Sequence, residues 1–199
     1  MALNFISSNI RIENVDVFGL AESIRASKFP MSTNIEELTS AITPRQSALG
    51  SCIPGTGHDC YLKGIIVQMD LTLPQYIWQQ IKRYHFFDTV SSQSTMHRIT
   101  KMDIAGQCTP EVDKSIIKLL TDLIKQYNDE TDPVWKKQIF VKIVANIPSG
   151  LMLSARVTTN YLQLKTIYNQ RKTHKLEEWV KFCNYVETLP MFEELVLNN

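Results

Sequence analysis

The segment from Lys82 to Arg98 gathers side chains that can do chemistry. It reads KRYHFFDTVSSQSTMHR and contains two Arg, two His and three Ser. Arginine presents a planar fork of N–H donors that matches a phosphate or a carboxylate. Arg83 also lies at the C-terminal end of a predicted helix, however, where a cation is favoured by the helix dipole alone. The residue types therefore leave two interpretations open: an anion site, or a polar loop that follows a helix.

A serine nucleophile is a further interpretation of the same segment. Ser91, Ser92 or Ser94 would need His85 or His97 as a general base, together with an acid that orients this base. No nucleophile-elbow motif frames any of these serines. The sequence therefore does not favour a hydrolase.

Residues 43–59 form a predicted loop, rich in Gly and Pro, that carries two other candidates. Cys52, His58 and Cys60 are metal-ligand types, but a zinc site needs a fourth ligand and none follows this spacing. The turn at Gly55–Gly57 lacks the Lys-Ser/Thr that completes a phosphate-binding loop. We therefore predict no metal site and an ordinary turn in this segment.

The composition predicts a single domain spanning residues 1–199. Hydrophobic residues make up 44% of the chain, and 21 basic against 20 acidic residues give a net charge of +1. This balance provides no electrostatic attraction for a polymeric nucleic acid or a membrane surface. Four cysteines without a Cys-x-x-Cys pair, and no signal-peptide or membrane-spanning pattern, favour a reduced, cytoplasmic protein.

One strand and the helix after it are the clearest elements of the sequence. Apolar residues alternate from Ile65 to Leu73, which predicts a strand with one buried face. Pro74 ends this strand and suits the first turn of a helix, which we predict over residues 75–84. The segment Lys82–Arg98 therefore begins where this helix ends.

Capping signals and helical spacing predict five further helices. They are expected over residues 33–42, from Thr109-Pro110, from Asp132-Pro133 to about Asn146, from about Thr159 and from about His174. The first of these depends on a capping box between Thr33 and Glu36. With one clear strand and a helix-rich second half, the pattern predicts an α+β fold.

The order and spacing of several residues along most of the chain match a known family pattern. The residues that keep this register are Ala21, Arg25, Ser27, Gln80, Arg83, Pro148, Asn160, Arg171 and His174, and Ser94 matches if the loop before it is one residue longer. In this arrangement the chain resembles the flavin-dependent thymidylate synthases, also called thymidylate synthase complementing proteins. The resemblance implies an α+β fold with a central antiparallel sheet, surrounding helices and a helix-rich C-terminal half.

The resemblance also implies an activity. The family methylates deoxyuridine monophosphate at C5, taking the carbon from methylenetetrahydrofolate and the hydride from reduced flavin. Arg171 would be the catalytic residue, because a cation beside the N3/O2 edge polarises the pyrimidine ring. By resemblance FAD would contact Arg83, Tyr84, His85 and Asn160, and the nucleotide would contact Gln80, Arg83, Ser94, Arg98 and Arg171. A homotetramer with sites shared between subunits is likewise implied.

The sequence departs from the family pattern at several charged positions. Tyr84 and His85 stand where the family has His and a second Arg. Val144 and Leu162 stand where it has Arg, and Arg98 is the candidate that takes over a phosphate contact. Each lost charged contact is worth about 1.5–3 kcal/mol. The alternative hypothesis is therefore a catalytically inactive descendant of the fold that binds a nucleotide or a protein partner.

Overall fold

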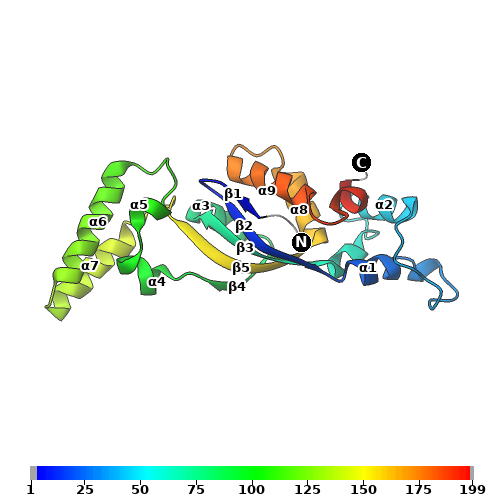
Figure 1. The fold of residues 1–199 in the computed structure, drawn as a ribbon, viewed down its shortest axis with the longest axis horizontal. Helices are drawn as coiled ribbons and strands as arrows, with labels where there is room; N and C mark the ends of the chain where they lie inside the picture. The colour runs from blue at the N-terminus through cyan, green and yellow to red at the C-terminus, as the bar shows by residue number, and fades with distance from the viewer. Residues whose placement is uncertain (1–3, 198–199) are drawn as a thin grey trace.

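The computed structural model describes residues 4–197 and is built around a five-stranded antiparallel sheet. The strands follow the order β1-β2-β3-β5-β4, so β3 pairs with β5 although the two strands are far apart in the sequence. Figure 1 shows this sheet as a long curved band that runs through the molecule. The strands are β1 (Phe5–Ile6), β2 (Arg11–Phe18), β3 (Ile66–Pro74), β4 (Asp88–Ser92) and β5 (Met152–Asn160).

Helices α3, α8 and α9 cover one face of the sheet (Figure 1). None of the helices in residues 4–197 is both long and apolar enough to cross a membrane. The α-helices are α1 (Leu20–Ala26), α2 (Pro44–Gly50), α3 (Gln75–Ile81), α4 (Thr95–Arg98), α5 (Ile104–Gln107), α6 (Lys114–Asp129), α7 (Pro133–Ala145), α8 (Tyr161–Arg171) and α9 (Glu177–Glu187). Short 3-10 helices are η1 (Phe29–Met31), η2 (Cys60–Gly64) and η3 (Ile99–Lys101), and η4 (Glu193–Leu197) is π-helical.

The core lies between β3 and the helices that cover it. Val67, Met69 and Leu71 are each 0% exposed, and the residues between them in the sequence are half-buried. This alternation confirms the strand that the sequence predicts from Ile65 to Leu73. The helix predicted after Pro74 is also confirmed, as α3, and it buries its apolar side against the same core.

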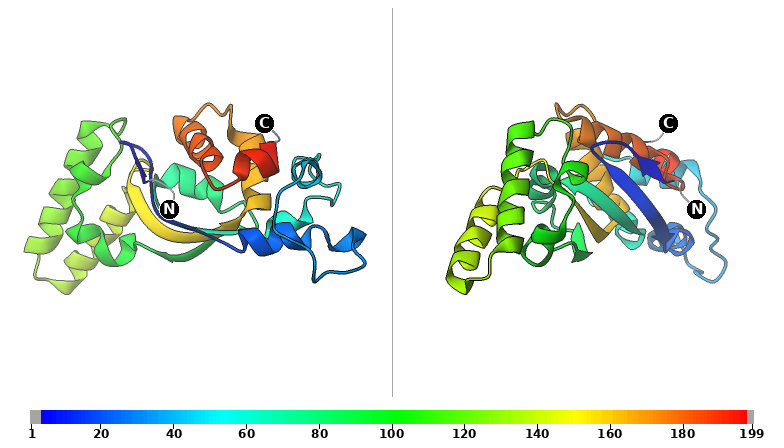
Figure 2. Two further views of the ribbon diagram at one scale, coloured as in Figure 1. Left: turned by 45° about the vertical axis from the view of Figure 1, so that its right-hand side comes forward. Right: turned by 60° about the vertical axis from the view of Figure 1, so that its left-hand side comes forward.

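The opposite face of the sheet is polar. On β3 it carries Gln68, Asp70 and Thr72, which alternate with the buried residues. The guanidinium of Arg156 on β5 donates to the carbonyl oxygen of Asn14 at 2.6 Å and lies 3.4 Å from the Asp70 carboxylate. Figure 2 shows α8, α9 and η4 together on the other side of the sheet. The apolar and polar faces therefore have different neighbours.

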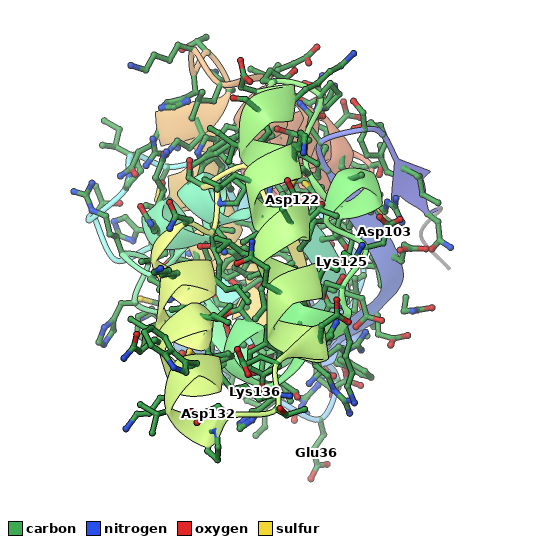
Figure 3. All side chains as sticks on the ribbon, turned by 90° about the vertical axis from the view of Figure 1, so that its left-hand side faces the viewer. Glu36, Asp103, Asp122, Lys125, Asp132 and Lys136 are labelled. Carbon is green, nitrogen blue, oxygen red and sulfur yellow. The ribbon has the colours of Figure 1, made fainter. Side chains whose placement is uncertain are left out.

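A helical arm, formed by α6 and α7, extends from one end of the sheet (Figure 1). Its own small core includes Leu120 and Ile143, both 0% exposed. Figure 3 looks onto the arm and shows Asp122 and Asp132 on its outer surface. Asp132 accepts hydrogen bonds from two backbone amides of α7, so the start signal at Asp132-Pro133 is confirmed.

The prediction of a helix over residues 33–42 is wrong. These residues form turns and irregular chain, and the Asn34 side chain accepts a hydrogen bond from the Glu36 amide. The capping box forms instead between Thr43 and Gln46, and it starts α2 inside the segment predicted as a loop. The reason is local, because an Asn that bonds to its own backbone favours a turn over a helix.

The helix expected from Thr109-Pro110 begins later, at Lys114, where the Asp113 side chain accepts from the Ser115 amide. Thr109 is buried instead, and its amide donates to the carbonyl of Gly150.

The segment near Thr159, predicted to begin a helix, is the end of β5, and α8 begins at Tyr161. The last predicted helix, α9, begins at Glu177 rather than near His174. The chain therefore contains three longer strands that the sequence analysis missed, β2, β4 and β5.

A buried ion pair fixes the segment around α2 and η2 to α8. The Lys165 ammonium lies 2.6 Å from the Asp59 carboxylate, and the two residues are 2% and 3% exposed. The same ammonium donates to the carbonyl oxygens of Gly50 at 2.7 Å and Cys52 at 2.6 Å. All three ammonium protons therefore have partners, which offsets the cost of burying the charge.

We predict that Lys165→Met lowers the free energy of unfolding by about 3–5 kcal/mol, because it leaves the Asp59 carboxylate buried without its cation. Urea unfolding followed by circular dichroism measures this change. Lys118→Met is the matched control, since Lys118 pairs with Asp122 on the exposed surface of the arm. Equal destabilisation by the two substitutions would contradict the role of the buried pair.

Candidate functional site

The Arg171 guanidinium, at the C-terminal end of α8, is held between two aromatic rings. Its central carbon lies 4.8 Å from the centre of the Trp179 ring and 5.8 Å from that of Tyr84. Its Nε donates a hydrogen bond of 2.8 Å to the Tyr84 hydroxyl. A cation over aromatic faces is attracted by their π electrons, and the hydrogen bond fixes its rotation. Arg171 is therefore placed in one orientation.

The two rings are themselves held in place. The Tyr84 hydroxyl donates to the Gln170 side-chain oxygen at 3.1 Å. Trp179 is 1% exposed, and its indole nitrogen donates to the Gln80 side-chain oxygen at 3.0 Å. The Gln80 amide oxygen thus supports Trp179, and Gln80 does not line the cavity beside Arg171.

A cavity of about 290 Å³ opens beside Arg171. Within residues 4–197, the terminal nitrogens of Arg171 and the whole side chain of Arg83 make no hydrogen bond or ion pair. Several N–H donors therefore remain free to bind the oxygens of a small ligand. The lining residues are Arg83, Tyr84, His85, Gln163, Thr166, Gln170 and Arg171.

His174 lies against the same cluster, with its ring 6.5 Å from that of Trp179. Partial burial lowers the pKa of His174, and repulsion from Arg171 and Lys175 lowers it further. Its Nδ1 accepts a hydrogen bond from the Leu176 amide at 3.1 Å, so the neutral ring carries its proton on Nε2.

Asn160 begins α8. Its side-chain oxygen accepts from the Gln163 amide at 2.9 Å, so Asn160 is the N-cap residue of this helix. Gln163 in turn accepts from the Phe86 amide at 3.4 Å, which connects the helix start to the segment that follows Tyr84 and His85. The capping bond leaves the Asn160 amide nitrogen without a hydrogen-bond partner among residues 4–197.

Ser94 and Arg98 line a second cavity, of about 1020 Å³, between β2 and residues 92–107. Ser94 caps the short helix α4 by accepting from the His97 amide at 3.3 Å. The two cavities share no lining residue. Arg83, Tyr84, His85 and Arg171 therefore lie at one cavity and Ser94 and Arg98 at the other, while Gln80 and Asn160 line neither.

Neither the serine nucleophile nor the metal site that the sequence analysis considered is assembled in residues 4–197. No hydrogen bond joins Ser91, Ser92 or Ser94 to the imidazole of His85 or His97. No three His, Cys, Asp or Glu side chains come together there as a metal site.

Sequence reasoning missed residues that orient Arg171 or line the cavities. Trp179, whose ring lies against Arg171, and Gln170, which lines the smaller cavity, were not singled out. Arg11 and Lys101 line the larger cavity. Arg11 could be found only from the pairing of β2 with β3, which the sequence did not reveal.

Comparison with known proteins identifies the fold. No protein-family model matches the sequence, and no curated protein is similar to it. A solved structure of thymidylate synthase X (ThyX) from Helicobacter pylori with FAD and dUMP matches with a TM-score of 0.65 and 9% identity, over 96% of this chain and 97% of that chain. The chain has the ThyX fold.

A second structure, of the flavin-dependent thymidylate synthase ThyX from Helicobacter pylori complexed with FAD and dUMP, agrees. It has a TM-score of 0.58 and 10% identity, and the match covers 96% of this chain and 98% of that chain. These matches confirm the α+β prediction with a central antiparallel sheet. At 9–10% sequence identity, these matches establish the fold of the chain and nothing further.

We predict that His174 makes stability depend on pH. Because its folded pKa is lowered from 6.5, the unfolded chain takes up this proton first as the pH falls. The free energy of unfolding should therefore fall below pH 6.5 until the folded pKa is passed, and His174→Gln should remove this part of the decline. Urea unfolding from about pH 8 to about pH 5 measures it.

His58→Gln, at an exposed position in the loop after α2, is the control and should leave the pH profile unchanged. A His174→Gln profile parallel to that of the wild type contradicts the prediction.

Proposed function

We propose that the chain is a divergent flavin-dependent thymidylate synthase-like enzyme that methylates a deoxyuridine monophosphate-type nucleotide. The observation that carries this proposal is the Arg171 guanidinium, oriented by Tyr84 and Trp179 with its terminal nitrogens free at a cavity. The fold and the register of Arg171 with Asn160 support the same assignment. The methyl carbon would come from methylenetetrahydrofolate.

The chemistry proposed for Arg171 is electrostatic. A guanidinium beside the N3/O2 edge of the pyrimidine draws electron density toward O2 and makes the ring more reactive at C5. A cation that is already in place stabilises the transition state more than a cation that must first be reoriented. The Tyr84 hydrogen bond and the Trp179 ring place Arg171 before the ligand arrives.

The cavity beside Arg171 limits what this chain can hold by itself. A volume of about 290 Å³ is at the lower end of small-molecule pockets, so it fits a pyrimidine or one flavin ring rather than a dinucleotide. We propose that Arg83, Tyr84, His85 and Asn160 contact FAD, which supplies the hydride when it is bound and reduced. The rest of FAD would then extend to another subunit, which agrees with a homotetramer.

Ser94 and Arg98 are proposed to hold the phosphate end of the nucleotide. Their cavity shares no residue with that of Arg171, and we propose that a nucleotide contacting both uses cavities from two copies of the chain. Four free cysteines are compatible with a reducing compartment, and we propose a cytoplasmic location.

The alternative is a catalytically inactive descendant that still binds a nucleotide or a protein partner. It is favoured by Leu162, which packs against the core where the family has an Arg, and by Tyr84 in place of His. Both hypotheses include an oriented Arg171, and they differ in whether flavin binds and turnover follows.

We predict that the purified protein takes up FAD and binds deoxyuridine monophosphate, and that Arg171→Ala weakens nucleotide binding about tenfold or more by removing a charged donor. Visible absorption measures bound flavin, and calorimetric titration measures nucleotide affinity. Arg45→Ala, on the exposed surface of α2, is the control. If the protein binds neither FAD nor deoxyuridine monophosphate, the proposal is wrong.

Turnover separates the enzyme from its alternative. Rescue of a thymidine-requiring strain by the wild type, lost in Arg171→Ala, supports the enzyme. Nucleotide binding without flavin uptake or rescue supports the inactive descendant.

We also predict that Tyr84→Phe weakens nucleotide binding by roughly tenfold, because Arg171 loses the hydrogen bond that fixes its Nε. The ring remains, so stacking on Arg171 and the fold are retained. Tyr127→Phe, on the helical arm, is the control. Unchanged affinity in Tyr84→Phe would show that the hydroxyl does not position Arg171.

A further inference from the structure

The larger cavity, of about 1020 Å³, is lined by basic side chains from two separate segments, β2 and the continuous stretch formed by α4 and η3. Arg11 comes from β2, His97 and Arg98 come from α4, and Lys101 comes from η3. We propose that this cavity binds a small ligand that carries two or more linked phosphate groups, such as a nucleoside diphosphate or triphosphate.

The sheet brings Arg11 to this place. Arg11 pairs with Thr72 on β3, and Thr72 pairs with Ser154 on β5. The Thr72 and Ser154 hydroxyl oxygens lie 2.7 Å apart, so the three residues form one row on the polar face. The Arg11 side chain, at the end of this row, is exposed and lines the cavity.

The opposite wall of the cavity is fixed to the same row. The Gln93 amide donates to the Ser154 carbonyl at 2.9 Å, and the Ser154 amide donates to the Gln93 side chain at 2.9 Å. This two-point attachment holds the segment that leads into α4, where Ser94 is the cap. His97 and Arg98 therefore start from a backbone that is already in place opposite Arg11.

The basic side chains have no anionic partner. Within residues 4–197, Arg11, Arg98 and Lys101 make no salt bridge and no side-chain hydrogen bond. Asp103 is the one carboxylate in the lining, and its oxygen already accepts from the Gly106 amide at 3.1 Å. Figure 3 shows Asp103 beside the arm, close to the N-terminal strands. Positive charge therefore predominates, although the whole chain carries only +1.

The size and charge of the cavity favour several phosphates over one. A single phosphate monoester carries about two negative charges and is satisfied by one bidentate arginine with a second donor. Here three permanent cations and an imidazole from two walls face a space as large as the pockets that hold whole nucleotides. Linked phosphates can contact both walls at once.

A nucleic-acid strand fits these observations less well. Such a strand needs a basic stripe that continues along the surface, and this chain has nearly equal numbers of acidic and basic residues. The inference rests on the proposed function for the roles of Ser94 and Arg98. It adds Arg11 and Lys101, and it assigns to this cavity linked phosphates in place of the single phosphate of deoxyuridine monophosphate.

The test is calorimetric titration of the full-length protein with orthophosphate, pyrophosphate and tripolyphosphate at one ionic strength. Tripolyphosphate should bind at least tenfold more tightly than orthophosphate. Arg11→Gln and Lys101→Gln should each weaken tripolyphosphate binding about tenfold. Two exposed positions on different walls are used, so that a folding defect in one variant does not decide the result.

The control is Lys118→Gln, on the outer surface of α6, which should bind tripolyphosphate as the wild type does. Equal affinity for all three anions, or unchanged binding in both Arg11→Gln and Lys101→Gln, would overturn the inference. Tighter binding of a single-stranded oligonucleotide than of tripolyphosphate would also overturn it.

This experiment tests the polyphosphate site separately from the proposed function. Arg171 lines the other cavity, so Arg171→Ala should weaken nucleotide binding about tenfold or more and leave tripolyphosphate affinity unchanged. If flavin and deoxyuridine monophosphate do not bind but tripolyphosphate does, the proposed reaction is lost and the polyphosphate site remains. If the reverse is found, the polyphosphate site is lost alone.

Discussion

The antiparallel pairing of β3 with β5 determines where every candidate residue lies. It runs without a register shift from Ile66 opposite Asn160 to Pro74 opposite Met152. At one end β5 continues directly into α8, and at the other end β3 continues into α3. Both helices return over the apolar face, so their C-terminal ends meet where the Tyr84 hydroxyl accepts from Arg171. A one-residue slip would turn the buried side chains to the polar face and separate these two ends.

The same pairing produces two chemically different sides. On the apolar side, aromatic rings restrict a single arginine and leave its terminal nitrogens at a small cavity. On the polar side, the row through Thr72 and Ser154 carries Arg11 toward α4 and a larger basic cavity. The first suits a planar ring, and the second suits phosphate oxygens, because guanidinium groups bind both in different geometries. The ThyX fold thus positions the groups, while the individual side chains decide the chemistry.

Elements defined by a local residue pattern could be predicted from the sequence, and contacts between residues far apart in the sequence could not. The strand from Ile65 to Leu73 was predictable because large apolar residues occupy every second position. The strand β2 was not, since Asn14 has φ +50° and a register shift interrupts its alternation. The strand β4 is exposed along its whole length and has no buried face to reveal it. The family resemblance made Arg171 and Tyr84 candidates, but their mutual contact, the Trp179 ring and the Lys165–Asp59 pair required the fold.

The central claim is that Arg171, held by Tyr84 and Trp179, faces a bound pyrimidine nucleotide. A crystal structure of the protein with deoxyuridine monophosphate tests it most directly. The account predicts the pyrimidine O2 within about 3 Å of a terminal nitrogen of Arg171, with Nε still donating to the Tyr84 hydroxyl. A nucleotide bound elsewhere, with the Arg171 cavity occupied only by solvent, would contradict the account.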